Sequence, residues 1–357
     1  MSVYYTAIIF LSIFAVLIIQ ISIFTSGTLT KDKKRIFHLL FSMIALGAFC
    51  EWLGVLLQST GPSTRIFHIV IKAIELSVAP SIGVLIAWVL EIRAQKLAAI
   101  GLTVNMFLEF LSGIFGFIYS VDSNSNYTHA KFYFIYIIAY VLSMIYFIYI
   151  ASKNIKRYQY NGISYFAMVV LFMIAGIIVQ LIFSEMKIVY VVLAIASVMM
   201  YVFTLEMIMQ TDKLTELINR RGYENYISHL DSECVVLFFD VDRFKDANDM
   251  YGHSFGDMCL SKIGTAIKNT YARFGKCFRY GGDEFCVILT KNFNGVEELN
   301  KKFVAEIKKL KQKDSRIPDV TIGYAFFNPE NGTVLQTIEE ADKMMYLHKE
   351  KRRNSAQ

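Results

Sequence analysis

Charged residues are scarce in this sequence: Asp, Glu, Lys and Arg make up only 18% of its 357 residues, whereas 55% are hydrophobic. Soluble domains ordinarily carry about 25% charged residues, so this composition argues against a wholly soluble chain. The scarcity is uneven, because long apolar runs fill the N-terminal part and the C-terminal part has the mixed composition of a globular domain. We therefore expect a membrane half, residues 1–210, and a cytosolic half, residues 211–357.

Cysteine is also sparse, and none of its five occurrences forms a CxxC pair or lies at a histidine spacing typical of zinc sites. We interpret these residues as reduced structural thiols, four of them in the cytosolic half. The chain shows no internal repeat and no low-complexity linker. The net charge of +6 lies largely in short loops between apolar runs, so it bears on topology and gives no reason to expect nucleic acid as a partner.

The apolar runs are long enough to cross a lipid bilayer, which takes about 20 mainly apolar residues per helix. The first run has no basic segment before it and no small-residue cleavage site, which argues against a signal peptide. We expect seven spans, at roughly 4–25, 36–58, 66–90, 97–119, 132–151, 163–184 and 187–209.

Basic residues in the short loops predict the orientation of these spans, because Lys and Arg concentrate on the cytosolic side. The first, third and fifth loops are basic: Lys31, Lys33, Lys34, Arg35; Arg93, Lys96; Lys153, Lys156, Arg157. The alternate loops hold only Arg65, Lys131 and Lys187 near the span ends. We expect a multi-pass protein of the inner or plasma membrane with the N-terminus outside and residues 211–357 in the cytosol.

Four ionisable residues fall inside the predicted spans, namely Glu51, Lys72, Glu75 and Glu109. Such residues are unfavourable in lipid and usually face a bundle interior. Lys72 and Glu75 are three positions apart and share a helix face, and Glu51 should lie at a similar depth toward the outer side. Two interpretations stay open: a structural ion pair that fixes helix packing, or a pocket that senses an unknown ligand.

The cytosolic half alternates strand-like and helix-like patterns, which predicts an α/β domain with a sheet of mixed direction. Residues 213–230 read as a helix, and 234–239 as a buried strand that ends at Asp240. The 3–4 spacing of apolar residues predicts helices around 260–271, 299–310 and 338–348, with a strand at 320–327.

Acidic residues gather at two places in this domain. Gly281 and Gly282 lie between two strand-like runs and predict a tight hairpin, because Gly tolerates positive φ and close backbone approach. Asp283 and Glu284 follow at once and should point to opposite faces. An ordinary polar hairpin tip would look the same, but Asp240 ends the upstream strand. Together these acids suit Mg²⁺, which takes few protein oxygens and lets phosphates supply the rest.

Groups suited to phosphate and to a purine base lie nearby in the sequence. The backbone amides around Phe244 could hold phosphate and Lys245 could neutralise it. Lys349 and Arg353, four apart near a predicted helix end, could hold outer phosphates, although a solvated helix terminus has the same appearance. Asn248 and Asp257 offer the acceptor and donor groups that a purine edge needs.

These pieces occur in an order that resembles the GGDEF family of diguanylate cyclases along residues 211–357. The matching segments are Asp212-x-Leu214-Thr215, Asn219-Arg220-Arg221, Asp240-Val241-Asp242-Arg243-Phe244-Lys245, Asn248-Asp249, Tyr251-Gly252-His253, Gly256-Asp257, Arg279 to Phe285, Thr321-Ile322-Gly323, Ala341-Asp342 and Tyr346-x-x-Lys349-x-x-x-Arg353-Asn354. The N-terminal half resembles the seven-helix sensor regions fused to bacterial signalling domains.

The resemblance implies a fold related to nucleotidyl cyclases and the condensation of two GTP into cyclic di-GMP with loss of pyrophosphate, across a homodimer. It implies two Mg²⁺ per active site, or Mn²⁺ in their place. The implied metal ligands are Asp240, the Val241 carbonyl, Asp283 and Glu284; the implied catalytic residues are Glu284, Asp283 and Lys245; and the implied substrate-binding residues are Asn248, Asp257, Phe244, His253, Lys349, Arg353, Gly281 and Gly282.

Some positions depart from the family's pattern. Glu216 and Arg352 stand where the family often has Gly, and neither is an expected ligand. The family's product-inhibition motif, Arg-x-x-Asp, would fall on Ala272 and Gly275, with Arg273 out of register. Two alternatives to the cyclase stay open: a non-catalytic nucleotide receptor, against which the intact acids argue, and a mixed-dinucleotide cyclase, against which Asp257 argues.

Overall fold

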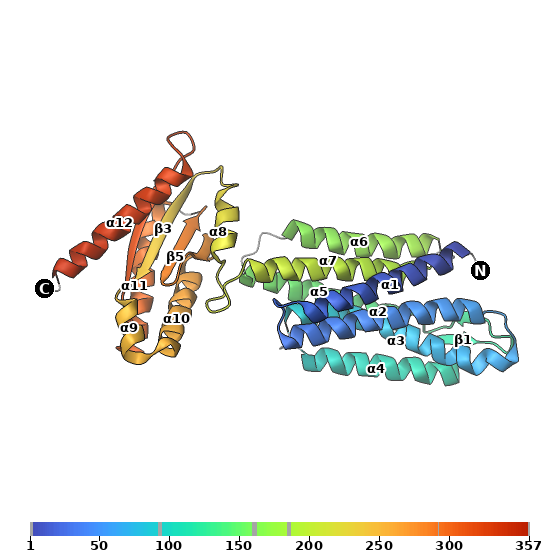
Figure 1. Cartoon of the computed structure of the whole chain (residues 1–357). Coiled ribbons are helices and arrows are strands. Elements are labelled where there is room, and N and C mark those ends of the chain that lie inside the picture. The colour runs from blue at the N-terminus through green and yellow to red at the C-terminus, as the bar shows by residue number, and fades with distance from the viewer. Residues whose placement is uncertain (1–2, 92–94, 159–162, 184–186, 292, 356–357) are drawn as a thin grey trace. The chain divides into compact units, whose positions relative to one another are not determined.

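The computed structural model describes residues 3–91, 95–158, 163–183, 187–291 and 293–355 (Figure 1). The chain divides into two compact units. The first is built from Met1–Arg157 and Asn161–Glu206, and the second mainly from Met207–Gln357.

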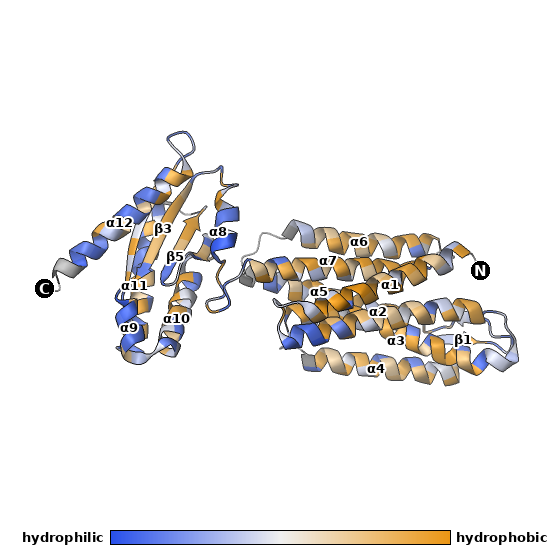
Figure 2. Ribbon diagram, viewed as in Figure 1, coloured by the Kyte–Doolittle hydropathy of each residue, from blue (hydrophilic) through white to orange (hydrophobic). Residues whose placement is uncertain are grey.

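The first unit is helical, with a short two-stranded sheet. Its elements are α1 (Val3–Thr25), α2 (Lys31–Leu57), the 3-10 turn η1 (Pro62–Thr64), α3 (Arg65–Leu90), α4 (Gln95–Phe115), β1 (Tyr119–Val121), β2 (Tyr127–His129), α5 (Phe134–Tyr158), α6 (Ile163–Ile182) and α7 (Val189–Met209). Figure 2 shows that hydrophobic residues dominate these helices along their lengths.

Six helices of the described residues are long and apolar enough to cross a membrane: α1, α2, α3 with its preceding turn, α4, α5 and α7. A helix forms at each of the seven predicted stretches. The sixth, α6, has only a shorter apolar part, Ser164–Gln180, so the expected count of seven spans is supported for six.

The predicted span 97–119 ends early, because α4 stops at Phe115 and the chain turns into a hairpin. Gly116 has a φ of 70°, a left-handed conformation that favours glycine and ends the helix. The Ser112 hydroxyl then accepts hydrogen bonds from the amides of Ile118 and Tyr119, at 2.8 and 3.1 Å. Residues 119–121 therefore form β1, which pairs antiparallel with β2.

Glu51, Lys72 and Glu109 lie buried in the first unit, and Glu75 is partly buried. Lys72 and Glu75 form an ion pair of 2.7 Å, as their three-residue spacing predicts. Glu51 is only 3% exposed and accepts a 3.5 Å hydrogen bond from the Tyr5 hydroxyl. A Cβ at Gly54 would lie 2.9 Å from the Lys72 ammonium nitrogen, so α2 packs closely against this pair.

The second unit is an α/β domain around a four-stranded sheet (Figure 1). Its elements are α8 (Arg220–Ile227), β3 (Cys234–Val241), α9 (Phe244–Tyr251), α10 (His253–Tyr271), β4 (Gly275–Arg279), β5 (Glu284–Leu289), the 3-10 turn η3 (Phe293–Gly295), α11 (Val296–Lys313), β6 (Val320–Phe327) and α12 (Val334–Ser355). The strand order is β4-β5-β3-β6.

The expected mixed sheet is wrong, because every pairing between these four strands is antiparallel. Strands β3 and β4 are joined by two helices and run parallel, but the hairpin inserts β5 between them. The one parallel contact among the described residues is an isolated bridge between Ile218 and Phe278. The sequence predicted strands interleaved with helices and one hairpin, but it could not reveal that β5 would lie between β3 and β4.

Strand β3 is buried on both faces, as its continuous apolar run predicts. Its odd-numbered residues, such as Leu237 and Phe239, pack in a core with residues of α10 and α11. Its even-numbered residues, such as Val236 and Phe238, pack in a second core with residues of α8 and α12. This alternation decides that the side chain of Asp240 lies on the α12 face.

The predicted helix 213–230 is wrong in its first half. The Asp212 carboxylate accepts hydrogen bonds from the amide and hydroxyl of Thr215, at 2.9 and 2.7 Å, and closes a turn there. Glu216 then adopts a φ of 58°, which a helix cannot contain. The helix begins only at Arg220, after Asn219 caps it by accepting a hydrogen bond from the Gly222 amide.

Candidate active site

Two carboxylates face each other at the end of the central strand. Asp240 on β3 is the direct register partner of Glu284 on β5, so their side chains lie on the same face of the sheet. Both belong to the face that α12 covers, since Cys286 and Ile288 of β5 join the core on that side. A pair of like charges in this position is unfavourable unless a cation lies beside it.

The glycine hairpin brings Asp283 to the same strand end. The Val241 amide donates a 3.2 Å hydrogen bond to the Asp283 carbonyl. Neither Gly281 nor Gly282 adopts positive φ, contrary to the expectation for a tight turn. A Cβ at Gly281 would lie 2.7 Å from a carboxylate oxygen of Glu284, so a larger residue there would displace that carboxylate.

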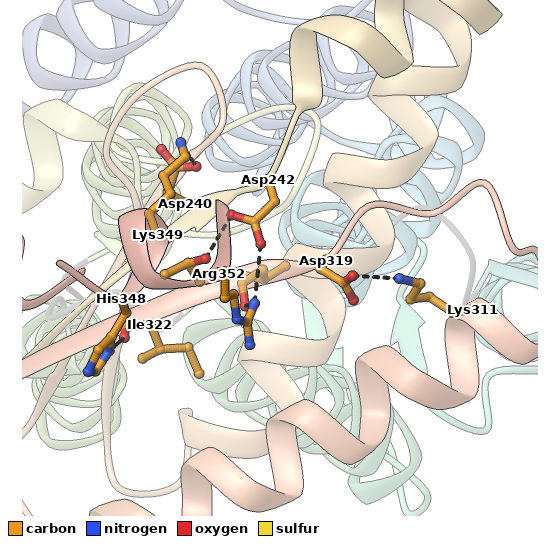
Figure 3. Close-up of polar contacts among 10 residues, drawn as sticks. Asp240, Asp242, Lys311, Asp319, Ile322, His348, Lys349 and Arg352 are labelled. Carbon is orange, nitrogen blue, oxygen red and sulfur yellow. Dashed lines mark hydrogen bonds and ion pairs between the residues drawn. The ribbon is translucent and has the colours of Figure 1, made fainter. Parts of the chain in front are cut away.

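Lysine and arginine side chains from α12 reach both aspartates that end β3 (Figure 3). The Lys349 ammonium forms an ion pair with Asp240 at 2.5 Å. One turn along, Arg352 donates to Asp242 and to the Val320 carbonyl, each at 3.2 Å. The Thr321 hydroxyl completes the binding of Asp242 with a 2.7 Å hydrogen bond. Two basic side chains of α12 therefore bind the two aspartates at the end of β3.

The pKa values of Asp240 and Glu284 are both raised in this cluster of acids. Burial raises the pKa of Asp240, and Asp283 and Asp242 add to this, while Lys349 acts in the opposite direction. Burial likewise raises the pKa of Glu284, followed by the charges of Asp283, Asp240 and Asp342, and Lys349 again opposes the shift. A site in which several carboxylates resist ionisation favours an added cation or an incoming proton.

The turn after β3 has the geometry of an anion cradle. Arg243 adopts a left-handed conformation, with φ 54° and ψ 36°, directly before α9. A left-handed residue at a helix start leaves successive backbone amides facing one side, which suits phosphate. Phe244 is half-buried against the core, and the Lys245 side chain is exposed to solvent.

The residues expected to bind a base also meet. Asn248 on α9 lies against Gly256 on α10, where a Cβ would overlap its side-chain oxygen. Asp257, next to Gly256, is exposed to solvent at the same helix junction. His253 is the first residue of α10 and is exposed. Arg353 lies on α12, but its side chain is outside the described residues.

As they stand, the described residues hold no group of three or more His, Cys, Asp or Glu side chains arranged to bind a metal ion. The donor set nevertheless fits a hard divalent cation that takes few protein ligands, because carboxylates with raised pKa lie together at one strand end. The Lys349 ammonium, in contact with Asp240, supplies positive charge at this place in the structure.

Sequence reasoning missed several residues of this site. Arg352 was noted only as a departure from a glycine, and Asp342 was given no role. Arg279 binds the Gly282 carbonyl at 2.7 Å and the Asp212 carboxylate at 3.1 Å, and so fixes the hairpin. The i, i+3 spacing of two basic residues on α12 could have pointed to Arg352, because Lys349 and Arg352 share a helix face. No local signal identifies the partner of Arg279.

The end of α7 is tied to the hairpin strand through a short chain of backbone contacts. Asn219 donates to the Met209 carbonyl at 2.8 Å through its side chain. Its neighbour Ile218 donates to the Cys277 carbonyl at 3.1 Å and accepts from the Arg279 amide at 2.7 Å. Strand β4, which leads into the glycine turn, is thus bonded to the segment that follows α7.

Comparison with known proteins shows what the second unit is similar to. The family described as "Diguanylate cyclase, GGDEF domain" matches residues 209–355. Diguanylate cyclase DosC of Escherichia coli (strain K12) is 34% identical over 157 residues, which cover 40% of this chain and 34% of that protein. Diguanylate cyclase TpbB of Pseudomonas aeruginosa (strain UCBPP-PA14) is 32% identical over 158 residues, which cover 40% of this chain and 36% of that protein.

Among solved structures, the GGDEF domain of DgcB from Caulobacter crescentus in complex with c-di-GMP is 25% identical, with a TM-score of 0.36, over 40% of this chain and 90% of that one. The match to the GGDEF family model covers residues 209–355, which is most of the second unit. The chain spans only about a third of the length of the curated relatives named above.

Proposed function

We propose that this protein is a membrane-bound diguanylate cyclase, which condenses two GTP molecules to cyclic di-GMP and two pyrophosphates. The observation that carries the proposal is the meeting of Asp240 and Glu284 in register at one strand end, with Asp283 beside them and a lysine from α12 against Asp240. The match of residues 209–355 to the GGDEF family supports it.

In the proposed reaction the 3′-hydroxyl of one GTP attacks the α-phosphate of the other. A new phosphorus–oxygen bond forms, the bond to the β-phosphate bridging oxygen breaks, and pyrophosphate leaves. Glu284 accepts the hydroxyl proton, for which its raised pKa suits it. Lys349 and Lys245 neutralise charge on the phosphates, with Arg353 as an outer contact. Lys349 must leave Asp240 for this, so its ion pair belongs to the nucleotide-free enzyme.

The GGDEF cyclases generally depend on a divalent metal, and Mg²⁺ fits the donor chemistry of this site. We propose that Asp240, the Val241 carbonyl, Asp283 and Glu284 hold two ions, with Mn²⁺ as a substitute. The bound metal would polarise the phosphates and lower the basicity of the leaving group. We propose that Phe244 and His253 line the nucleotide site, that the glycine turn leaves it room, and that Asn248 and Asp257 select guanine.

The chemistry requires two GTP molecules held face to face, and one domain holds one of them. We propose a homodimer, in which each subunit presents an α-phosphate to the other subunit's 3′-hydroxyl, so that catalysis rests mainly on orientation. The six long apolar helices support a membrane location. We propose a seventh span at α6, the N-terminus outside, the boundary between the functional halves at residue 210, and control of dimer geometry by the membrane region.

Turnover and topology test this proposal separately. Full-length protein in membranes is incubated with GTP and Mg²⁺, with and without ATP, and its products are identified by mass. Cyclic di-GMP alone is expected; no dinucleotide would refute the cyclase, and a mixed product would refute guanine selection. A reporter fused after Lys33 is expected in the cytosol and one at Asn124 outside, and the reverse result would refute the orientation.

A further inference from the structure

Helix α4 carries two buried polar side chains that find no hydrogen-bond partner among the described residues. Asn105 is 5% exposed and Glu109 is 0% exposed. Both polar atoms of each side chain lack a partner. Buried polar groups are bonded in the great majority of cases, so two such residues together call for a bound group.

The two residues lie on one face of α4, because they are four positions apart. Farther along that face, a Cβ at Gly113 would lie 2.7 Å from Ile69 on α3 and 3.0 Å from the Tyr119 hydroxyl oxygen. The Ser112 hydroxyl binds the start of β1. This face of α4 therefore packs against α3 and the β1–β2 hairpin, and Glu109 is enclosed by protein.

A row of aromatic rings leads inward at this end of the helices. His129 is exposed and stacks on Tyr133 with ring centroids 3.7 Å apart. The ring centroid of Tyr127 lies 5.6 Å from that of His129 and 6.0 Å from that of the fully buried Tyr119. Leu108, the neighbour of Glu109 on α4, packs against the buried cluster that contains Tyr119, and so do Tyr127 and Tyr133. The rings thus extend from the surface to the part of α4 that carries Glu109.

The same row already binds one ammonium group. The Lys72 nitrogen lies 4.8 Å from the centre of the Tyr127 ring while it pairs with Glu75. Aromatic faces attract ammonium ions, more strongly where water is excluded. Lys72 satisfies Glu75 only, which leaves Glu109 as a buried carboxylate without a cation.

We propose that Glu109 and Asn105 form a binding site for a small organic ammonium ion that enters past the aromatic row. The Glu109 carboxylate and the Asn105 carbonyl oxygen accept its N–H groups, and the tyrosine faces bind its charge. A metal ion fits less well, because the described residues hold no cluster of three His, Cys, Asp or Glu side chains. That the ligand regulates the cyclase rests on the proposed function; the binding itself does not.

The test uses the full-length protein in lipid nanodiscs, titrated calorimetrically with propylammonium chloride, with NaCl at equal ionic strength as the control. We expect saturable binding and a rise of several degrees in Tm at saturation, because a ligand that binds only the folded state stabilises it. The Glu109→Gln variant keeps the side-chain shape and is expected to bind at least tenfold more weakly. The matched control, Glu51→Gln, removes a buried charge that Tyr5 already satisfies, and is expected to bind normally.

Three outcomes would overturn the proposal: no propylammonium binding to the wild type, equal binding by Glu109→Gln, or an equal Tm rise with NaCl. If Glu109→Gln does not fold, the same tenfold loss is expected of Asn105→Leu. Since no GTP is used, a protein that fails to bind propylammonium yet makes cyclic di-GMP refutes this site alone.

Discussion

Replacing Asp240 with asparagine is expected to affect the stability and the catalytic activity of the second unit in different ways. The raised pKa of Asp240 means that its ionised form is disfavoured in the folded state, so the stability due to this group is present below its unfolded pKa and is lost as pH rises through its folded pKa. Above that folded pKa the carboxylate is ionised and makes the folded state less stable. Asp240→Asn removes it, together with the cross-strand repulsion against Glu284.

The expected gain in stability is small and the expected loss of activity is large. An unfavourable cross-strand charge pair contributes roughly 0.2–1 kcal/mol, and the Lys349 pair, whose lysine side chain is 40% exposed, offsets part of it. We expect the Tm of a fragment of residues 207–357 to be unchanged or to rise by up to about 4 °C. Loss of a charged metal ligand should reduce turnover at least about a thousandfold, equivalent to about 4 kcal/mol.

Thermal unfolding of the fragment and cyclic di-GMP formation by the full-length protein measure the two effects. Asp319→Asn is the matched control, because Asp319 pairs with Lys311 at 2.7 Å on the surface, away from Glu284. It should leave both quantities nearly unchanged. A fall in Tm of Asp240→Asn by more than about 4 °C, or turnover near that of the wild type, would contradict the reasoning.

Three further predictions concern residues around the site. Arg352→Ala removes an ion pair of Asp242 and should reduce turnover about three- to tenfold. The change in the free energy of unfolding should stay below about 1 kcal/mol, because the arginine side chain is 53% exposed. The control Lys343→Ala on the same helix should change neither quantity, and equal effects of both substitutions would argue against a specific role of Arg352. The acid limb of the pH–rate profile should follow Glu284, whose pKa is raised by burial and then by Asp283, Asp240 and Asp342; Asp342→Asn should move this limb to lower pH and Glu339→Gln should not, as turnover measured between pH 5 and 8 would reveal. Product inhibition should be weak because Ala272 and Gly275 replace the expected motif, and a Cβ at Gly275 would overlap the β5 backbone; tight non-competitive inhibition that survives Arg273→Ala would indicate a different inhibitory site.

The sequence predicted well those structural features that depend on a single segment of the chain. The strand ending at Asp240, the helices at 260–271 and 299–310 and the strand at 320–327 all follow from period and burial. The pairing of Lys72 with Glu75 follows from helical spacing. These features depend on residues only a few positions apart, so a single sequence is enough to predict them.

Features decided by distant partners were missed. The Asp212 turn replaced the start of a helix because Arg279, far along the chain, completes the binding of that carboxylate. The hairpin strand β5 separated β3 from β4 and made the sheet antiparallel. The contact of Arg352 with Asp242 joins residues 110 positions apart. Local propensity carries no information on such pairs, so the contacts that support the acids could not be predicted.

The hydrogen-bonded path from Met209 through residues 218 and 219 to β4 has a mechanical consequence. Its links are hydrogen bonds to Cys277 and Arg279 of β4, so a displacement of residues 209–219 would act directly on that strand. The glycine turn follows Arg279 at once, and β5 begins behind it with Glu284, so the displacement would act next to the acids. Inserting two or three flexible residues after Gln210 would break this connection and uncouple the acids from α7.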